Sequence, residues 1–280
     1  MTFSPNQTHI VGILNLTPDS FSDGGQFIDP DTALARARQM VADGADIIEI
    51  GGESTRPGYT PVPVAQELER VLPVAKALVA SLSVPIAIDT QKPSVADAVL
   101  GAGISILNDI SCLADTTLAT VAAKHGAYYV LMHNRPHEAH PAYQQLIPDI
   151  LADLQAGIDT LRAAGVPTDK IIIDPGIGFA KHQDENIEIL RQLHQFTQLP
   201  CGNGETYPLL VGASKKRFME HALGLGLTER SEATIAVTAY AIQQGTRFIR
   251  VHDVLANKRA ARMIDHLLAK GANEHDHPAH

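Results

Sequence analysis

Carboxylate and amide side chains end three of the apolar runs along this 280-residue chain. These positions hold Asp89, Asn108 and Asp174. Together they offer two carboxylates, which accept hydrogen bonds, and one amide, which both donates and accepts. An aminopyrimidinone heterocycle needs this combination for its ring N–H and amino groups and for its mixed edges. Helix capping is the alternative role. It suits Asp89 better than Asp174, because a Pro-Gly turn rather than a helix follows Asp174.

Basic side chains follow two later apolar runs. Three consecutive cations come directly after Ser214, beside a predicted helix start, and such a combination attracts anions. Arg250 and His252 stand two residues apart on a predicted strand, so their side chains point to the same side. An Arg and a His directed at one spot suit a phosphate or pyrophosphate group. For the three cations, a solvated basic face is the alternative.

Two loops that contain paired glycines follow the first and second apolar runs. The first loop, 15–25, contains Phe21, an aromatic side chain that packs either on a ligand or on the protein itself. The second, 51–58, begins with glycines that let the backbone approach a ligand. Thr55 and Arg56 follow and can both hold an anion, although Arg56 could instead pair with a surface carboxylate.

Several classes of protein are disfavoured by what the sequence lacks. It has no G-x-S-x-G elbow, no P-loop and no GxGxxG motif, so covalent catalysis on a serine elbow is not favoured. A net charge of −9 argues against a nucleic-acid partner. Its two cysteines, Cys112 and Cys201, lack zinc-site spacing and fit a reducing compartment. There is no basic, apolar leader and no run approaching the roughly 20 apolar residues of a membrane helix, so we expect no membrane association and a cytoplasmic location.

Short apolar runs alternate with helical stretches and must position these side chains. The runs lie at 10–15, 46–50, 85–88, 105–107, 127–132, 171–173, 209–211 and 247–251. The expected helices are 30–44, 64–82, 93–101, 116–125, 148–165, 184–197, 216–222 with 229–244, and 254–270. Nearly continuous apolar runs are typical of strands that are buried on both faces. This alternation predicts a single (β/α)8 TIM barrel, with a large doubly wound sheet as the alternative.

In such a barrel the carboxyl ends of all strands share one face, which carries the active site. Every run exits into hydrogen-bonding side chains, although wet loops alone would account for part of that polarity. We expect one barrel domain over 1–272 and a flexible polar tail over 273–280. The three histidines of the tail are a weak metal-site candidate beside this simpler interpretation.

The stretch ILNLTPDSFSDGG at 13–25 and the stretch GGESTRPG at 51–58 resemble the two long signatures of the dihydropteroate synthase family. Shorter matches follow in the same order at 88–90, 108–110, 131–133, 174–179, 214–216 and 250–253. The resemblance spans about 10–253, and signatures of this length are not a matter of chance. It implies a TIM barrel, usually a homodimer, that condenses 6-hydroxymethyl-7,8-dihydropterin pyrophosphate with p-aminobenzoate. The products are 7,8-dihydropteroate and pyrophosphate, a transferase step of folate biosynthesis that needs Mg²⁺ and is inhibited by sulfonamides.

The resemblance also implies a role for each matching residue. Asn15 would contact the metal. The catalytic groups would be Asp174, Lys216, Arg250 and His252. The pterin pyrophosphate would contact these four residues and also Thr55, Asp89, Asn108, Met132 and Val251. The p-aminobenzoate pocket would consist of Phe21, Thr55, Arg56, Pro57, Phe179, Ser214 and Lys216.

The chain departs from the family pattern in three places. Lys215 stands where the family usually has arginine, so the rigid guanidinium fork is lost. The loop after the fifth run, 134–145, differs from the usual Met-Gln-Gly continuation, and 201–207 reads as a longer hairpin. Three rival interpretations stay open. They are a non-catalytic pterin-binding paralogue, a pterin-dependent methyltransferase of the same superfamily, and a sugar-phosphate barrel enzyme.

Overall fold

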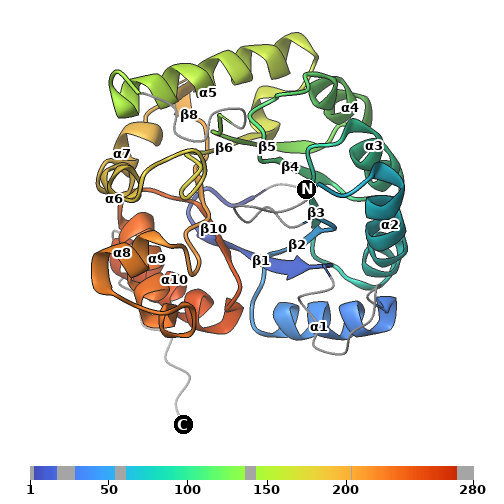
Figure 1. Cartoon of the computed structure of the whole chain (residues 1–280), viewed down its shortest axis with the longest axis horizontal. Coiled ribbons are helices and arrows are strands. Elements are labelled where there is room, and N and C mark those ends of the chain that lie inside the picture. The colour runs from blue at the N-terminus through green and yellow to red at the C-terminus, as the bar shows by residue number, and fades with distance from the viewer. Residues whose placement is uncertain (1–2, 18–28, 54–60, 136–142, 203, 270–280) are drawn as a thin grey trace.

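Eight parallel strands surround the centre of the molecule, and helices cover them on the outside (Figure 1). The computed structural model describes residues 3–17, 29–53, 61–135, 143–202 and 204–269. The strands are β1 (His9–Asn15), β2 (Ile47–Gly51), β3 (Ile86–Asp89), β4 (Ile106–Asp109), β5 (Tyr128–Met132), β6 (Ile171–Asp174), β9 (Leu210–Val211) and β10 (Phe248–Val251). Their order around the sheet is β6-β5-β4-β3-β2-β1-β10-β9.

The sheet closes on itself between its two terminal strands. A parallel bridge joins Ile173 of β6 to Leu209 beside β9, and the Ile173 N–H donates to the Pro208 carbonyl at 3.0 Å. Closure of eight parallel strands with helices between them confirms the predicted (β/α)8 barrel.

The helices that cover the barrel follow the expected order. They are α1 (Pro30–Ala42), α2 (Val64–Ser81), α3 (Pro93–Gly101), α4 (Thr117–His125), α5 (Leu146–Ala163), α6 (Gln183–Arg191), α7 (Leu193–Phe196), α8 (Phe218–Leu223), α9 (Ser231–Gln243) and α10 (Val254–Leu268), with short 3₁₀ turns η2 (Thr168–Lys170) and η3 (Leu227–Glu229). The start of α1 shows why the sequence folds this way. Asp29 accepts a hydrogen bond from the Thr32 N–H at 3.0 Å, and Pro30 occupies the first helical position, where it costs no hydrogen bond.

Two elements differ from the expectation. The helix expected over 184–197 divides at Gln192, whose backbone leaves the helical region with φ −113° and ψ 20°. This break lets Leu193 and Phe196 both reach full burial. The helix expected from Lys216 begins instead at Phe218. The expected hairpin over 201–207 is confirmed as the antiparallel pair β7 (Pro200–Gly202) and β8 (Glu205–Thr206).

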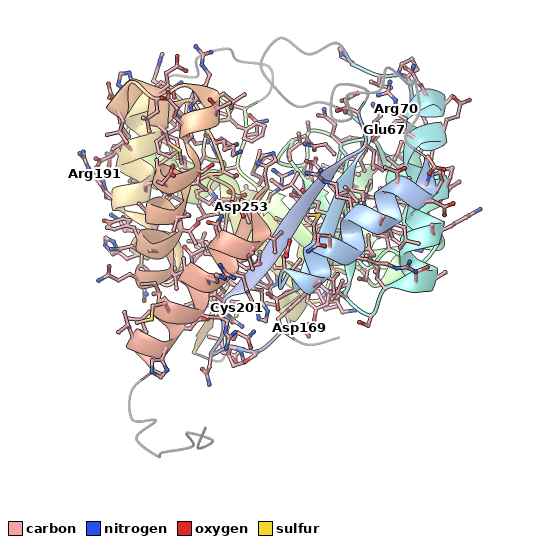
Figure 2. The ribbon with its side chains drawn as sticks, turned by 90° about the horizontal axis from the view of Figure 1, so that it is seen from below. Glu67, Arg70, Asp169, Arg191, Cys201 and Asp253 are labelled. Atoms are coloured by element: carbon pink, nitrogen blue, oxygen red, sulfur yellow. The ribbon has the colours of Figure 1, made fainter. Side chains whose placement is uncertain are left out.

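Apolar packing forms two layers on either side of the sheet. The outer and larger cluster fills the space between strands and helices. The inner cluster plugs the barrel and consists of Val11, Ile47, Ala87, Ile106, Tyr128, Val130, Ile172, Leu210 and Phe248. Phe3 packs against this plug with ring centroids 5.0 Å from Phe248 and 5.3 Å from Tyr128. Figure 2 shows the two ends of the barrel, with Cys201 and Asp169 at one end and Glu67 and Arg70 at the other.

None of the helices that the structure describes is both long and apolar enough to cross a lipid bilayer. The tail expected over 273–280 lies outside the described residues, so the proposed domain boundary stays a prediction.

Candidate active site

A polar layer lies directly above the apolar plug, at the carboxyl ends of the strands. Side chains on a strand alternate between its two faces, so the residue two places after each plug residue also points inward. On five strands, these residues are Glu49, Asp89, Asn108, Asp174 and Arg250. The barrel therefore places charged and amide groups from five strands around one spot.

Arg250 lies at the centre of this layer and connects four strands. Its Nε donates to Glu49 Oε1 at 2.6 Å, and its Nη2 donates to Asp89 Oδ2 at 2.9 Å. The other oxygen of Glu49 accepts from Asn108 Nδ2 at 2.9 Å. Burial would disfavour the guanidinium charge, but the neighbouring carboxylates outweigh it and raise the Arg250 pKa above its ordinary value. The residue is therefore a fixed cation in the floor of the site.

Two oxygens of this layer have no hydrogen-bond donor within the described part of the protein. Asp89 Oδ1 and Asn108 Oδ1 are both buried and unpartnered. An acceptor that is buried without a donor costs about 1–3 kcal/mol. Burial also raises the pKa of Asp89 to about 7, against the opposing effect of Arg250. This pair of oxygens fits a ligand edge that presents N–H groups.

A pocket opens beside Arg250, and it contains most of the predicted pterin-site residues. Its lining consists of Asn108, Ile110, Met132, Asp174, Ile177, Phe179, Gly212, Lys216 and Arg250. Asp174 Oδ1 accepts a hydrogen bond from the Gly176 N–H at 2.7 Å. Burial nevertheless raises the pKa of Asp174 to about 6. A carboxyl group buried to this degree favours a cation or an N–H donor as its neighbour.

Lys216 lines the same pocket. Its Nζ donates to the Ile177 carbonyl at 2.5 Å and lies 4.0 Å from the centroid of the Phe179 ring. Burial lowers the pKa of Lys216 to about 7, and the charge of Arg250 adds to this effect. An anion bound here would favour the charged form of the lysine.

Two glycines in the turn after β6 let Lys216 and the His133 carbonyl approach the backbone closely. Gly178 has a φ of +83°, and a Cβ added there would lie 2.5 Å from Lys216 Cδ. A Cβ added at Gly176, with a φ of +72°, would lie 2.0 Å from the His133 carbonyl oxygen. Only glycine fits these two positions, both for conformation and for space.

Ser214 and His252 contact each other at the rim of the barrel. The Ser214 hydroxyl and His252 Nδ1 are 2.9 Å apart, and the His252 N–H donates to the same hydroxyl at 3.3 Å. His252 is exposed to solvent at the end of β10, whereas Ser214 is buried. The two predicted anion-binding strand ends, β9 and β10, are thus joined directly.

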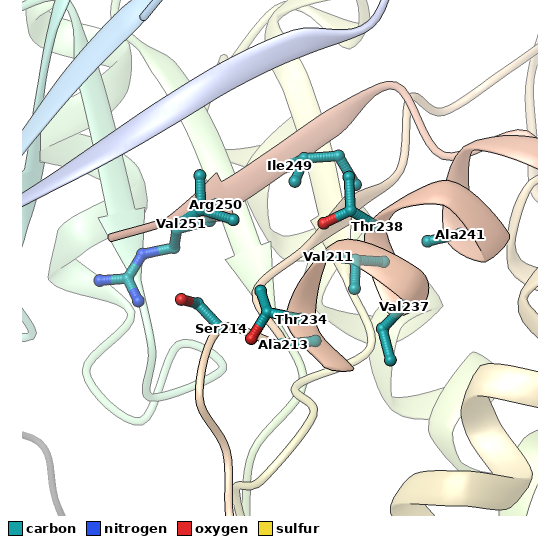
Figure 3. Close-up of a pocket in the computed structure, with 10 residues that line it drawn as sticks. All are labelled: Val211, Ala213, Ser214, Thr234, Val237, Thr238, Ala241, Ile249, Arg250 and Val251. Carbon is teal, nitrogen blue, oxygen red and sulfur yellow. The ribbon is translucent and has the colours of Figure 1, made fainter. Parts of the chain in front are cut away.

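Not every predicted residue reaches the pocket. Val251 is buried in the outer cluster and lines a small apolar pocket beneath α9, so only its main chain faces the site. Figure 3 shows this second pocket, with the Arg250 guanidinium directed away from Ile249 and Ala241. Asn15 ends β1 and is paired in register with Gly51 of β2. Four further predicted residues lie outside the described residues, namely Phe21, Thr55, Arg56 and Pro57.

Two buried charged residues that contact the pocket lining were not predicted from the sequence. Glu49 lies within the run Ile-Ile-Glu-Ile, where a buried charge signals a buried partner. Lys181 is also buried; its Nζ lies 3.0 Å from His133 Nδ1 and donates to the Phe179 carbonyl at 2.9 Å. Burial lowers the pKa of Lys181 to about 7. Both residues brace groups that line the pocket.

The altered loop after β5 is anchored by its first two residues. Asn134 Nδ2 donates to the Ile110 carbonyl at 2.8 Å, and Arg135 Nε donates to Asp153 Oδ2 at 2.9 Å. Within the part of the loop that the structure describes, both side chains therefore hold the backbone in place.

The comparisons with known proteins agree with this geometry. The model of the pterin-binding enzyme family matches residues 11–252. A dihydropteroate synthase from Bacillus subtilis (strain 168) is 46% identical over 270 residues, which cover 96% of this chain and 92% of that relative. Among solved structures, a Clostridium difficile dihydropteroate synthase obtained in the presence of pteroic acid has a TM-score of 0.90 at 41% identity, over 96% of this chain and 100% of that one. A Xanthomonas albilineans dihydropteroate synthase with 4-aminobenzoic acid has a TM-score of 0.88 at 35% identity, over 96% of both chains.

Proposed function

The chain belongs to the pterin-binding enzyme family, and from this premise we propose that it is a dihydropteroate synthase. It would condense 6-hydroxymethyl-7,8-dihydropterin pyrophosphate with p-aminobenzoate, releasing pyrophosphate. The observation that carries this proposal is the pocket that Asn108, Asp174, Lys216 and Arg250 line together. Such a pocket offers acceptors for the pterin N–H groups, and it offers the fixed cation of Arg250 and the ammonium of Lys216 for the pyrophosphate tail.

The reaction breaks the bond between the pterin methylene carbon and a pyrophosphate oxygen. The aniline nitrogen forms a bond to the same carbon and then loses a proton. Lys216, Arg250 and His252 would stabilise the negative charge that develops on the leaving group. The carboxylate of Asp174 would stabilise the positive character of the pterin. Because aniline is a weak nucleophile, holding it beside the methylene carbon provides much of the rate.

The p-aminobenzoate ring would pack against Phe179, near the junction of Ser214 and Lys216. Sulfonamides that carry the same aniline nitrogen would compete for this position, and we expect them to inhibit the enzyme. The other predicted members of this subsite, Phe21, Thr55, Arg56 and Pro57, keep their roles as predictions.

Asn15 is the proposed contact for Mg²⁺. Among the residues that the structure describes, no three His, Cys, Asp or Glu side chains form a group that could hold a metal ion. An amide oxygen at the rim fits Mg²⁺ all the same, because this ion often takes most of its ligands from substrate phosphates and water. When bound, the ion would supply charge neutralisation to the departing pyrophosphate.

A homodimer and a cytoplasmic location are further parts of the proposal. Large apolar side chains are exposed on α9 and α10, namely Tyr240, Leu255, Met263, Leu267 and Leu268. The two helices pack against each other. Contiguous exposed apolar surface marks protein interfaces, and we propose that these side chains contribute to one.

The deciding experiment is a coupled pyrophosphate-release assay with the dihydropterin pyrophosphate, Mg²⁺ and p-aminobenzoate. Release should depend on p-aminobenzoate and fall by about 100-fold or more in Lys216→Ala and in Asp174→Asn. Lys124→Ala is a matched control, because this lysine is exposed on α4 and pairs with Asp97. A folded protein that binds the pterin but releases no pyrophosphate would contradict the proposal and favour the non-catalytic paralogue. Methyl transfer without pyrophosphate release would favour the methyltransferase.

A further inference from the structure

Lys215 has a left-handed backbone conformation, and it lies directly between two residues of the proposed site. It lies between Ser214 and Lys216, and its φ is +55°. This left-handed conformation brings the Cβ atom close to a backbone carbonyl oxygen, so it is unfavourable for any residue other than glycine. It persists only where the surrounding structure holds it.

Two buried side chains of the α9 N-terminus hold both sides of this residue. The Lys215 N–H donates to Thr234 Oγ1 at 3.1 Å. The Lys215 carbonyl accepts from Arg230 Nη1 at 3.0 Å. Thr234 is 3% exposed and Arg230 is 5% exposed, so water does not replace either contact easily.

Each of these side chains is itself fixed in direction. The Thr234 hydroxyl donates to the Arg230 carbonyl at 2.7 Å, which turns a lone pair of its oxygen toward Lys215. Arg230 also donates from Nη2 to Glu220 Oε2 at 2.7 Å and from Nε to the Leu225 carbonyl at 3.2 Å. The guanidinium therefore joins α8 and the segment after it to the turn at Lys215.

The turn directs its two neighbours to different partners in the site. Ser214 meets His252 at 2.9 Å, and Lys216 Nζ meets the Ile177 carbonyl at 2.5 Å. Without the left-handed residue, the chain direction after Ser214 would change, and the ammonium of Lys216 would leave the pocket.

We infer that Thr234 and Arg230 are positioning residues of the active site. They hold the backbone of Lys215 in its left-handed form so that Ser214 and Lys216 both reach the pocket. Lys215 acts through its main chain, which is why lysine serves here where the family usually has arginine. The inference rests on the proposed function only for its kinetic readout.

A rescue experiment tests this directly. Thr234→Val removes the acceptor and should lower kcat/KM for the dihydropterin pyrophosphate by about tenfold, because the left-handed backbone of Lys215 loses one of its two supports. Adding Lys215→Gly should restore most of the loss, because glycine adopts a φ of about +55° without support. Adding Lys215→Ala should not restore it, because alanine keeps the Cβ. Arg230→Gln should show a similar loss and a similar recovery with glycine.

Thr238→Val is the matched control. Thr238 lies one turn along α9, is equally buried at 3% exposure, and donates to Asn257 Oδ1 at 2.7 Å rather than contacting Lys215. Its variant should keep kcat/KM near the parent value and gain nothing from Lys215→Gly, even if its melting temperature falls. Equal recovery by glycine and alanine would overturn the inference, and so would a large loss in Lys215→Ala alone.

Crystal structures separate this inference from the proposed function. The contact between Lys216 Nζ and the Ile177 carbonyl should be lost in Thr234→Val and regained in Thr234→Val with Lys215→Gly. That result stands even if the parent enzyme releases no pyrophosphate. An unchanged contact in Thr234→Val would overturn the positioning role whatever the activity.

Discussion

Single side chains set the charge state of the site. Besides Asp89 and Lys181, two groups that are proposed to act in the reaction have a pKa near neutral. Burial raises the pKa of Asp174 to about 6 and lowers that of Lys216 to about 7. The proposed chemistry needs Asp174 ionised and Lys216 protonated. The value of kcat/KM for the dihydropterin pyrophosphate should therefore decline on both sides of this interval, because this parameter reports the free enzyme.

The variant Lys216→Arg separates the two limbs of that profile. A guanidinium stays protonated far above neutral pH, so the alkaline decline should disappear while the acid decline persists. The measurement is kcat/KM against pH in matched buffers, with Lys124→Arg on the surface as control. An alkaline limb that is unchanged in the Lys216→Arg enzyme would show that another group titrates there.

Several of these residues could be predicted from the sequence because they follow apolar runs. Asp89, Asn108 and Asp174 were identified in this way, and the structure brings all three beside Arg250 or its pocket. Glu49 was missed because it lies inside such a run, where no change of pattern marks it. Lys181 was missed because its burial depends on β5 and the turn after β6, which meet only in the folded barrel.

At the scale of elements, the connection from β4 to α4 depends on one carboxylate. Asp109 accepts from the Ser111 N–H at 2.8 Å, the Leu113 N–H at 2.7 Å and the Tyr129 hydroxyl at 2.8 Å. These bonds hold Cys112 and Leu113 at positive φ values of 56° and 58°. The carboxylate therefore shapes the loop that begins at Ile110, a residue of the pocket lining.

Asp109→Asn should destabilise the protein by about 2–4 kcal/mol, because the amide turns an N–H group toward a backbone donor. The change is measured as the free energy of unfolding in urea. Tyr129→Phe removes only one of the bonds and should cost about 1 kcal/mol. Asp115→Asn, at an exposed position, is the control. If Asp109→Asn and Asp115→Asn cost the same, the loop does not depend on this network.

The strands could be placed within two residues from the sequence, and the reason is physical. Parallel strands buried on both faces are continuous in hydrophobicity, and each ends where a polar side chain begins. The helix break at Gln192 and the late start of α8 could not be predicted. Both arise from tertiary packing, which places Leu193 and Phe196 in the core and uses Lys216 in the pocket rather than in a helix.

At the scale of the molecule, the exposed apolar side chains of α9 and α10 lead to a test of the proposed homodimer. Leu267→Glu combined with Met263→Glu should convert a dimer to a monomer in light scattering after size exclusion, because charges would be buried without partners. Leu223→Glu on α8 is the control, since Leu223 and Leu267 are similarly exposed, at 63% and 65%. A parent protein that is monomeric at micromolar concentration would contradict the homodimer.

The barrel closes between β6 and β9, and this contact between neighbouring strands involves the fewest paired residues. Five residue pairs connect β1 to β2, whereas one bridge between Ile173 and Leu209 closes the ring. Transient opening of the barrel should begin there, so the Ile173 amide should take up deuterium from solvent sooner than the Ile88 amide. Asp174 and Gly212 lie on either side of this join and line the same pocket. A ligand bound between them would connect β6 to β9 across this join. Its binding should therefore slow deuterium uptake at the Ile173 amide.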